Sequence, residues 1–161
     1  IVKKNHMDIP WHDSQTRKGR ASIKGEPKEK ASVIGRVGMM FLSCGTGAWR
    51  VRSSMNTMSE CMGLTCTADI GLMSINYTCF DGEACFSQSL CLTNTGVNNS
   101  KLTRLESFIN DFVSRCDSLT CEQVHNELDD IEKIHGLTRR LFWALRRHLP
   151  AERSHSCLAV D

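Results

Sequence analysis

Two runs of alternating residues on either side of Asp81-Gly82 constrain the fold of this chain more than any other feature. In residues 73–79 and 84–92, apolar and small polar side chains take turns along the chain. A period of two is typical of strands that bury one face. Asp-Gly between such runs favours a two-residue type I′ turn, in which both turn positions need positive φ. The pattern therefore predicts an antiparallel β-hairpin.

A two-residue turn also fixes which residues of the hairpin face each other. Apolar residues then meet apolar residues along one face, where Gln88 is the one polar residue. A slip of one residue would move every apolar side chain to the polar face. The opposed pairs predicted in this way are Cys79 with Ala84, Tyr77 with Phe86 and Met73 with Leu90.

The segment before the hairpin has the periodicity of a helix. From Val33 to Met62, apolar residues recur at steps of three or four, which indicates an apolar stripe on one long helix or on two helices in line. Gly45 and Gly47 lie in its middle, and each costs about 1 kcal/mol relative to alanine in a helix. We expect a break at these glycines and a helix end at Gly63, because a helix C-cap favours glycine.

Helical periodicity returns after the loop at residues 95–99. Apolar residues from Leu102 to Cys116 form one wide face, and Asn99 or Ser100 can cap the start of this helix. A last helix is predicted to begin at Thr120, where Gln123 three residues later completes a capping box.

Gly136 is expected to end this last helix. The expected fold class is thus α+β: a long N-terminal helix broken at Gly45-Gly47, an antiparallel hairpin and two C-terminal helices. The helices must cover one face of a hairpin that is too small to be stable alone.

Composition divides the 161 residues into three parts. Residues 1–30 are polar, lack apolar periodicity and are expected to be a disordered leader. Residues 31–136 form the predicted domain, which is acidic, with 12 Asp/Glu against 7 Lys/Arg. Residues 137–161 form a basic tail, with 5 Lys/Arg against 2 Asp/Glu. An acidic central region argues against a nucleic-acid partner.

The same composition bears on where such a chain resides. No apolar run reaches the roughly 20 residues of a membrane helix, and no secretory signal is recognisable at the N-terminus. The nine cysteines show no zinc-binding spacing. We therefore expect buried structural thiols in a reducing cytoplasm.

Catalytic signatures are missing from the sequence. It contains no phosphate loop, no dinucleotide fingerprint and no metalloprotease or nucleophile-elbow motif, so no cofactor or metal is predicted. His125 and Asp129 are the candidates for acid–base chemistry, and structural roles are favoured for both. Arg50 can meet an anionic group at the following helix start, or it can be solvated or paired with acidic side chains of the central region, and the second interpretation is favoured.

Several segments resemble the N-terminal domain of the threonine/serine exporter family. They are Gly35-Arg-Val-Gly-Met-Met, Cys44-Gly-Thr-Gly-Ala-Trp-Arg-Val51, Ala68-Asp-Ile-Gly-Leu72, Tyr77-Thr-Cys-Phe-Asp-Gly-Glu83 and Asn94-Thr-Gly-Val-Asn98. The resemblance implies a soluble cytoplasmic domain that precedes a membrane domain at the bacterial inner membrane. That membrane domain exports threonine and serine, and it is the partner that the resemblance implies.

The ligand-binding candidates are Arg50, Asp69, Thr78 and Asn98, with threonine or serine as the implied ligand. Thr78 lies on the polar face of the predicted hairpin, and the other three lie in the segments that resemble the family. The favoured function is a regulatory or structural domain that is not an enzyme and does not transport alone. The alternatives are a small hydrolase-like domain and a free-standing amino-acid-binding module.

The resemblance weakens after Gly136, where the family continues into an apolar helix. Residues 137–161 instead carry five arginines. Back-translation of this tail in another frame permits an apolar membrane segment. We therefore interpret the tail as the product of a frameshift, a hypothesis that the coding DNA can test.

Overall fold

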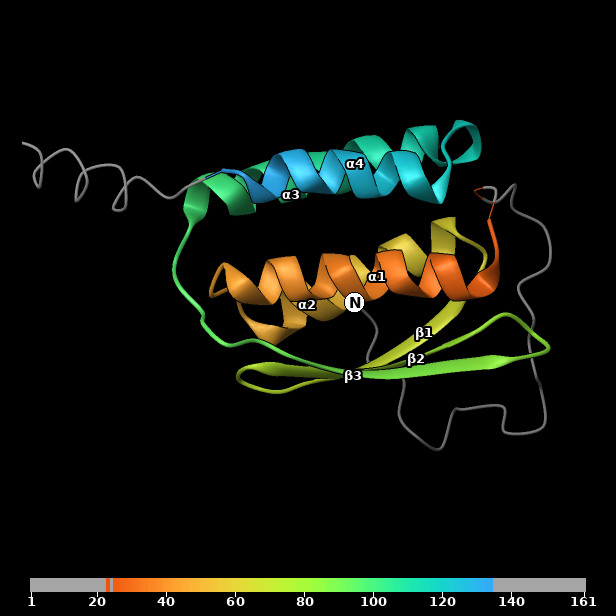
Figure 1. The fold of residues 1–161 in the computed structure, drawn as a ribbon, viewed down its shortest axis with the longest axis horizontal. Helices are drawn as coiled ribbons and strands as arrows, with labels where there is room; N and C mark the ends of the chain where they lie inside the picture. The colour runs from red at the N-terminus through yellow and green to blue at the C-terminus, as the bar shows by residue number, and fades with distance from the viewer. Residues whose placement is uncertain (1–22, 24, 135–161) are drawn as a thin grey trace, which may run out of the picture.

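The protein folds into three layers: a sheet, a helix pair against it, and a second helix pair on the outside (Figure 1). The computed structural model describes residue 23 and residues 25–134. In chain order the elements are α1 (Pro27–Ser43), α2 (Ala48–Cys61), β1 (Thr65–Ile70), β2 (Ser74–Phe80), β3 (Cys85–Cys91), α3 (Asn99–Arg115), the 3-10 turn η2 (Cys116–Ser118) and α4 (Cys121–Glu132). The α+β class is confirmed.

The first helix begins earlier than its apolar pattern indicated. α1 begins at Pro27, where a missing N–H costs nothing because the first helical N–H groups have no partner within the helix. Glu26 and Glu29 form a capping box around this start. Residues 27–30 therefore belong to the fold rather than to the predicted leader, and residues 1–22 and 135–161 lie outside the described residues.

The predicted break at Gly45-Gly47 is confirmed, but the two helices it separates are not in line. Gly45 has φ +72°, a left-handed conformation that favours glycine. The chain reverses there, so that α2 packs beside α1. Lys30, at the start of α1, donates a hydrogen bond of 3.4 Å to the Met62 carbonyl at the end of α2. The apolar stripe thus lies on two antiparallel helices that face each other.

The helix end predicted at Gly63 is confirmed. α2 ends at Cys61, and Gly63 follows with φ +73°. Its left-handed conformation turns the chain from α2 directly into the first strand of the sheet.

The sheet has three antiparallel strands in the order β1-β2-β3, one more than predicted. The missed strand, β1, lies along the edge of β2 and places Ala68 opposite Tyr77. In β1, threonine and aspartate alternate with Cys66, Ala68 and Ile70. This alternation is a strand signal, but small residues and one carboxylate make it weak.

The hairpin exists, but its predicted register is wrong by two residues. Phe80 pairs with Cys85, so the connection has four residues rather than two. The Asp81 carboxylate accepts hydrogen bonds from the Glu83 and Ala84 N–H groups, at 2.8 and 2.7 Å. These bonds stabilise the longer turn, in which Gly82 alone has positive φ.

A shift of two residues changes each partner but keeps each side chain on its face. Cys79 therefore lies opposite Phe86 instead of Ala84, and Tyr77 lies opposite Gln88 instead of Phe86. The division into an apolar and a polar face survives the error. Gln88, the polar residue on the apolar face, lies 2.6 Å from the Tyr77 hydroxyl.

The inner face of the sheet packs on α1 through glycine. Ile75, Tyr77 and Cys79 are buried against the helices. A Cβ atom at Gly35 would lie 2.3 Å from the Tyr77 hydroxyl oxygen, so only glycine lets the ring reach the helix backbone. There the hydroxyl donates to the Ala31 carbonyl at 2.9 Å.

The outer layer is formed by α3 and α4, which lie over α1 and α2 on the side away from the sheet (Figure 1). The Thr120–Gln123 capping box at the start of α4 is confirmed, with bonds of 2.9 and 3.2 Å. α4 ends at Glu132, and the end predicted at Gly136 lies outside the described residues. Leu105, Phe112, Val124 and Leu128 bury the apolar faces of this pair.

Candidate functional site: the outer face of the sheet

The outer face of the sheet is a surface of small polar side chains. It forms because alternate residues of each strand point away from the helices, and no described element covers them. Two rows cross the three strands. The first row is Thr67, Thr78 and Ser87, and the second is Asp69, Asn76 and Ser89.

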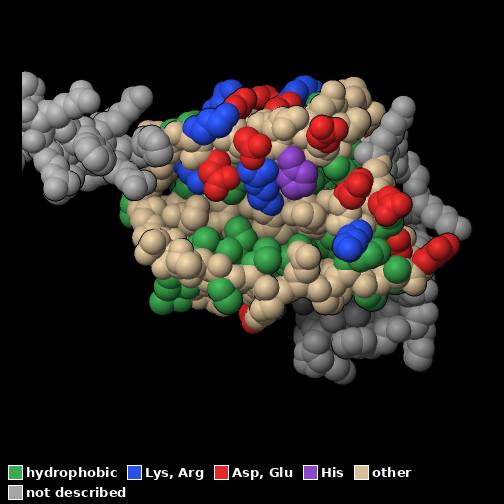
Figure 2. Space-filling model, in the orientation of Figure 1, with side chains coloured by type: hydrophobic (Ala, Val, Ile, Leu, Met, Phe, Trp, Pro, Cys, Tyr) green, Lys and Arg blue, Asp and Glu red, His purple; other side chains and the backbone are tan. Residues whose placement is uncertain are grey.

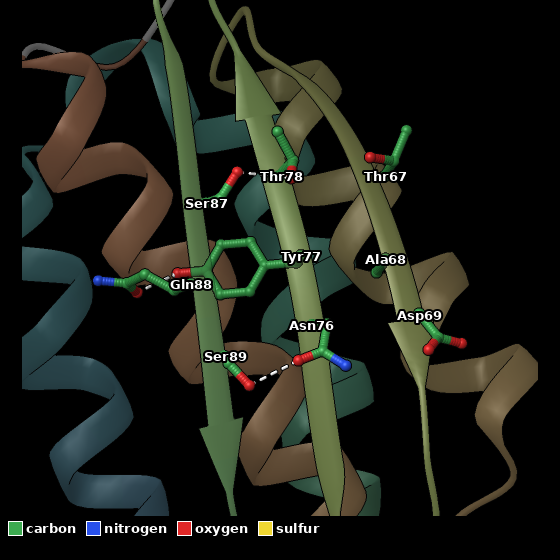
Figure 3. A pocket seen from close by; sticks show the side chains of 9 residues that line it. All are labelled: Thr67, Ala68, Asp69, Asn76, Tyr77, Thr78, Ser87, Gln88 and Ser89. Carbon is green, nitrogen blue, oxygen red and sulfur yellow. Dashed lines mark hydrogen bonds between the residues drawn. The ribbon is translucent and has the colours of Figure 1, made fainter.

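Hydrogen bonds tie β2 to β3 within both rows (Figure 3). The hydroxyls of Thr78 and Ser87 lie 2.8 Å apart, and Ser89 donates to the Asn76 side-chain oxygen at 2.6 Å. These side chains surround a shallow hollow of about 590 Å³, which Ala68, Tyr77 and Gln88 also line. The side chains of β2 and β3 are thus held in place before any ligand arrives.

The chemistry of this hollow suits a small polar ligand. Asp69 supplies a carboxylate, which can accept hydrogen bonds from an ammonium group. Hydroxyl and amide groups beside it can both donate and accept hydrogen bonds. Figure 3 shows the Asn76 amide nitrogen on the side of its strand that faces Asp69. The face therefore offers acceptors for a cation and donors for an anion within one surface.

The structure brings together two of the four predicted ligand-binding residues. Asp69 and Thr78 both line the hollow, on neighbouring strands. Arg50 and Asn98 do not line it. Thr67 lines the hollow as well, and the sequence-based prediction missed it because β1 was not recognised as a strand.

Arg50 is engaged in structural contacts. Its guanidinium lies 3.3 Å from the Glu106 carboxylate on α3, and 5.1 Å from the centre of the Trp49 ring. Of the favoured alternatives, solvation or pairing with an acidic side chain, the structure shows the pairing. Contacts of this kind between half-exposed groups contribute on the order of 0–1 kcal/mol.

Asn98 is a helix cap. Its side-chain oxygen accepts a 3.0 Å bond from the Lys101 N–H, so the cap lies one residue before the predicted Asn99 or two before Ser100. Its amide nitrogen donates to the Ile134 carbonyl at 3.1 Å. One side chain thus joins the start of α3 to the residues that follow α4.

His125 and Asp129 both lie beside Arg36 of α1, a residue that the sequence-based prediction did not select. The Arg36 guanidinium lies 3.3 Å from His125 Nδ1 and donates to the His125 carbonyl at 3.1 Å. It also donates to Asp129 and, at 2.9 Å, to Glu132. Figure 2 shows that a histidine, basic side chains and acidic side chains gather on one face of the molecule.

The cluster shifts the titration of its members. Burial, and then the Arg36 cation, hold the pKa of His125 below its ordinary value of 6.5, although Asp129 and Glu29 favour the protonated form. The hydrogen bond and charge of Arg36 also hold the pKa of Asp129 below its usual range. His125 and Asp129 are therefore partners of a structural arginine.

Cysteines in the described part of the chain are free thiols, most of them buried. Cys66 and Cys79 face each other across β1 and β2. A hydrogen bond between the two thiols, together with burial, raises the pKa of Cys79. The same hydrogen bond lowers the pKa of Cys66. Within residues 25–134, no cluster of histidine, cysteine or carboxylate side chains is arranged to hold a metal ion.

Comparison with protein families gives one assignment. A model of the family described as "Putative threonine/serine exporter" matches residues 32–145. No curated protein and no solved structure matches the chain. Across the described residues, every helix is too short or too polar to cross a membrane.

The family match covers more than half of the 161 residues and includes α1 from its second turn, the whole sheet and both outer helices. The match also extends past residue 136, the predicted end of the domain. This chain belongs to the threonine/serine exporter family.

Proposed function

We propose that this chain acts as a regulatory domain of a threonine/serine exporter on the cytoplasmic side of the bacterial inner membrane. Support for the exporter relation comes from the family match over residues 32–145. The proposed partner is the membrane domain of the same family. The domain itself neither catalyses a reaction nor moves a substrate across a membrane.

The ligand of this domain, in our proposal, is free threonine or serine bound on the outer face of the sheet. The observation that carries this proposal is the single carboxylate of Asp69 among the hydroxyl and amide groups that line the hollow. An amino acid has an ammonium group, which suits Asp69. It also has a carboxylate, which can accept hydrogen bonds from the hydroxyls of Thr67 and Thr78.

Titration calorimetry of the full chain with threonine, serine and leucine tests this ligand. Threonine and serine should bind, and Asp69→Asn should weaken both by about tenfold or more, because the charge-assisted bond to the ammonium is lost. Thr78→Val should weaken them less. Asp111→Asn, which alters an exposed carboxylate on α3, is the matched control and should change nothing.

Two outcomes of this titration would contradict the amino-acid ligand. One is that wild-type protein binds neither threonine nor serine. The other is that Asp69→Asn and Asp111→Asn bind both amino acids as wild type does, which would place the ligand away from the sheet.

The absence of catalysis is proposed because Arg36 engages both of the candidate acid–base groups. The Arg36 guanidinium is bonded to Asp129 and lies against Nδ1 of His125. A broad hydrolase screen of the wild type and of His125→Ala checks this. A hydrolytic activity that His125→Ala abolishes would contradict the proposal.

A further inference from the structure

Exposed apolar side chains gather at one end of this molecule. Among the described residues, five large apolar side chains are exposed. Leu72 is 90% exposed, Val97 75% and Trp49 67%. Met73 and Val113 are much less exposed, at 36% and 39%. All but Val113 lie in the turns and helix starts at the same end, which we call the apolar end (Trp49, Leu72, Met73 and Val97).

Backbone contacts show that these segments are neighbours. The Gly96 N–H donates to the Ser43 carbonyl at 3.1 Å, which brings the residues before α3 to the end of α1. The Leu92 N–H donates to the Met73 carbonyl at 2.8 Å, which joins the turn between β1 and β2 to the same segment. In Figure 1 the connection between α1 and α2, the turn between β1 and β2 and the start of α3 all lie at the left end of the molecule.

The described chain also ends at this place. Asn98 lies at the start of α3 and holds the Ile134 carbonyl at 3.1 Å, so α4 returns to the apolar end. The family match continues from there through residue 145. The last described residue thus lies beside the segment that contains Val97.

The chemistry of the apolar end is that of a membrane-contacting surface. An indole has an apolar body and one N–H donor, and tryptophan is enriched where lipid headgroups meet acyl chains. The Arg50 guanidinium lies 5.1 Å from the centre of the Trp49 ring, and the Arg50 side chain stays 36% exposed while it pairs with Glu106. Lys101 lies at the same end, in the first turn of α3, where its N–H donates to the Asn98 side chain beside Val97. Cations beside exposed apolar groups favour anionic lipids.

We propose that the apolar end rests on the anionic headgroup layer of a phospholipid bilayer, with Trp49, Leu72 and Val97 entering the boundary with the acyl chains. This inference rests on the proposed role as a domain of a membrane exporter. It orients the molecule, with β-strands and helices running away from the bilayer. The turn between β2 and β3 then lies farthest from the membrane, and the outer face of the sheet does not face the bilayer.

Vesicle sedimentation with the full chain tests this orientation. The probe is a vesicle of equal parts phosphatidylglycerol and phosphatidylcholine, and the wild type should sediment with it. A triple variant, Trp49→Ser with Leu72→Ser and Val97→Ser, should have a vesicle partition coefficient at least about tenfold lower than the wild type. The variant lacks the apolar side chains that would be buried in the bilayer interface. Val113→Ser removes an exposed apolar residue of α3 outside the apolar end and should partition as the wild type does.

Fluorescence adds a readout that identifies the contacting residue. The chain has three tryptophans, so Trp11→Phe and Trp143→Phe leave Trp49 as the one reporter. Its emission should shift to shorter wavelength with vesicles, and brominated lipid should quench it. Thermal unfolding of the triple variant and of Val113→Ser should match the wild type, since the side chains altered in these two proteins are exposed.

The proposed orientation is overturned if the wild type does not sediment with the vesicles, or if the triple variant sediments with them as the wild type does. Trp49 emission that does not respond to vesicles would overturn it too. Threonine titration of the same preparations separates this result from the proposed function. Threonine binding without vesicle binding would contradict only the proposed orientation. Vesicle binding without threonine binding would contradict only the proposed ligand.

Discussion

Two neighbouring residues of α1 enter very different interfaces, and the contrast shows how the layers are held. Gly35 faces the sheet, where a single added carbon would meet the Tyr77 hydroxyl at 2.3 Å. Arg36 faces α4, where its guanidinium binds groups on His125, Asp129 and Glu132. The first interface depends on close packing, and the second depends on charge between partly exposed groups. Core packing tolerates no added volume, whereas the charged interface responds to pH and salt.

The packed interface should break first. Gly35→Val should lower the free energy of unfolding by about 3 kcal/mol, near the upper end of the usual cost of overpacking, because the Tyr77 ring has to move. Gly96→Val is the matched control. A Cβ there meets nothing within 4 Å, and Gly96 is not among the glycines with positive φ. Urea unfolding followed by circular dichroism measures both, and equal losses in the two variants would refute the close approach.

Loss of the charged interface should have a smaller effect. Arg36→Gln removes the ion pairs to Asp129 and Glu132 and should cost about 1–2 kcal/mol, since the acids are more than half exposed and the arginine is about three-quarters covered. Arg50→Gln, which loses one ion pair to Glu106, should cost under about 1 kcal/mol. Hydrogen exchange should show faster opening of α4 in Arg36→Gln. Unchanged protection of α4 would mean that apolar contacts alone hold it.

The contrast also explains which parts of the fold could be predicted from the sequence. Signals that act over a few residues were sufficient: the glycine break, the C-cap at Gly63 and the capping box of Thr120 and Gln123 all occur as predicted. Arg36 was not selected, because its partners are 89 to 96 residues away in the chain. Nothing near Arg36 in the sequence distinguishes it from a solvated surface arginine.

Errors in the sheet have a related cause. Alternation determines the face of a residue but cannot distinguish registers that differ by two residues. The turn decides between them, and there the Asp81 carboxylate stabilises a four-residue connection. The polar face was therefore predicted, with Thr78 on it, while the cross-strand partners and the third strand were not. Asn98 was predicted as a ligand-binding residue, but in the structure it is a cap.

The smallest expected effect concerns His125 and the pH dependence of the charged interface. An arginine N–H can only donate, so the contact with Arg36 needs an unprotonated Nδ1 on His125. The folded protein holds the pKa of His125 below 6.5, its ordinary value, chiefly through burial and then through Arg36. Between the folded and the unfolded pKa, the unfolded chain binds more protons. Stability from this group is therefore complete above about pH 7 and declines as pH falls through the folded pKa.

A variant without the imidazole isolates the contribution of His125 to the pH dependence of stability. In urea titrations between about pH 7.5 and 5, the free energy of unfolding should fall less for His125→Gln than for the wild type. Asp129 does not confuse this range, because Arg36 holds its pKa below the usual range of a carboxyl group and it titrates at lower pH. Parallel curves for the two proteins would mean that His125 has the same pKa folded and unfolded. A steeper fall for the wild type would show that protonation of His125 weakens the contact between α1 and α4.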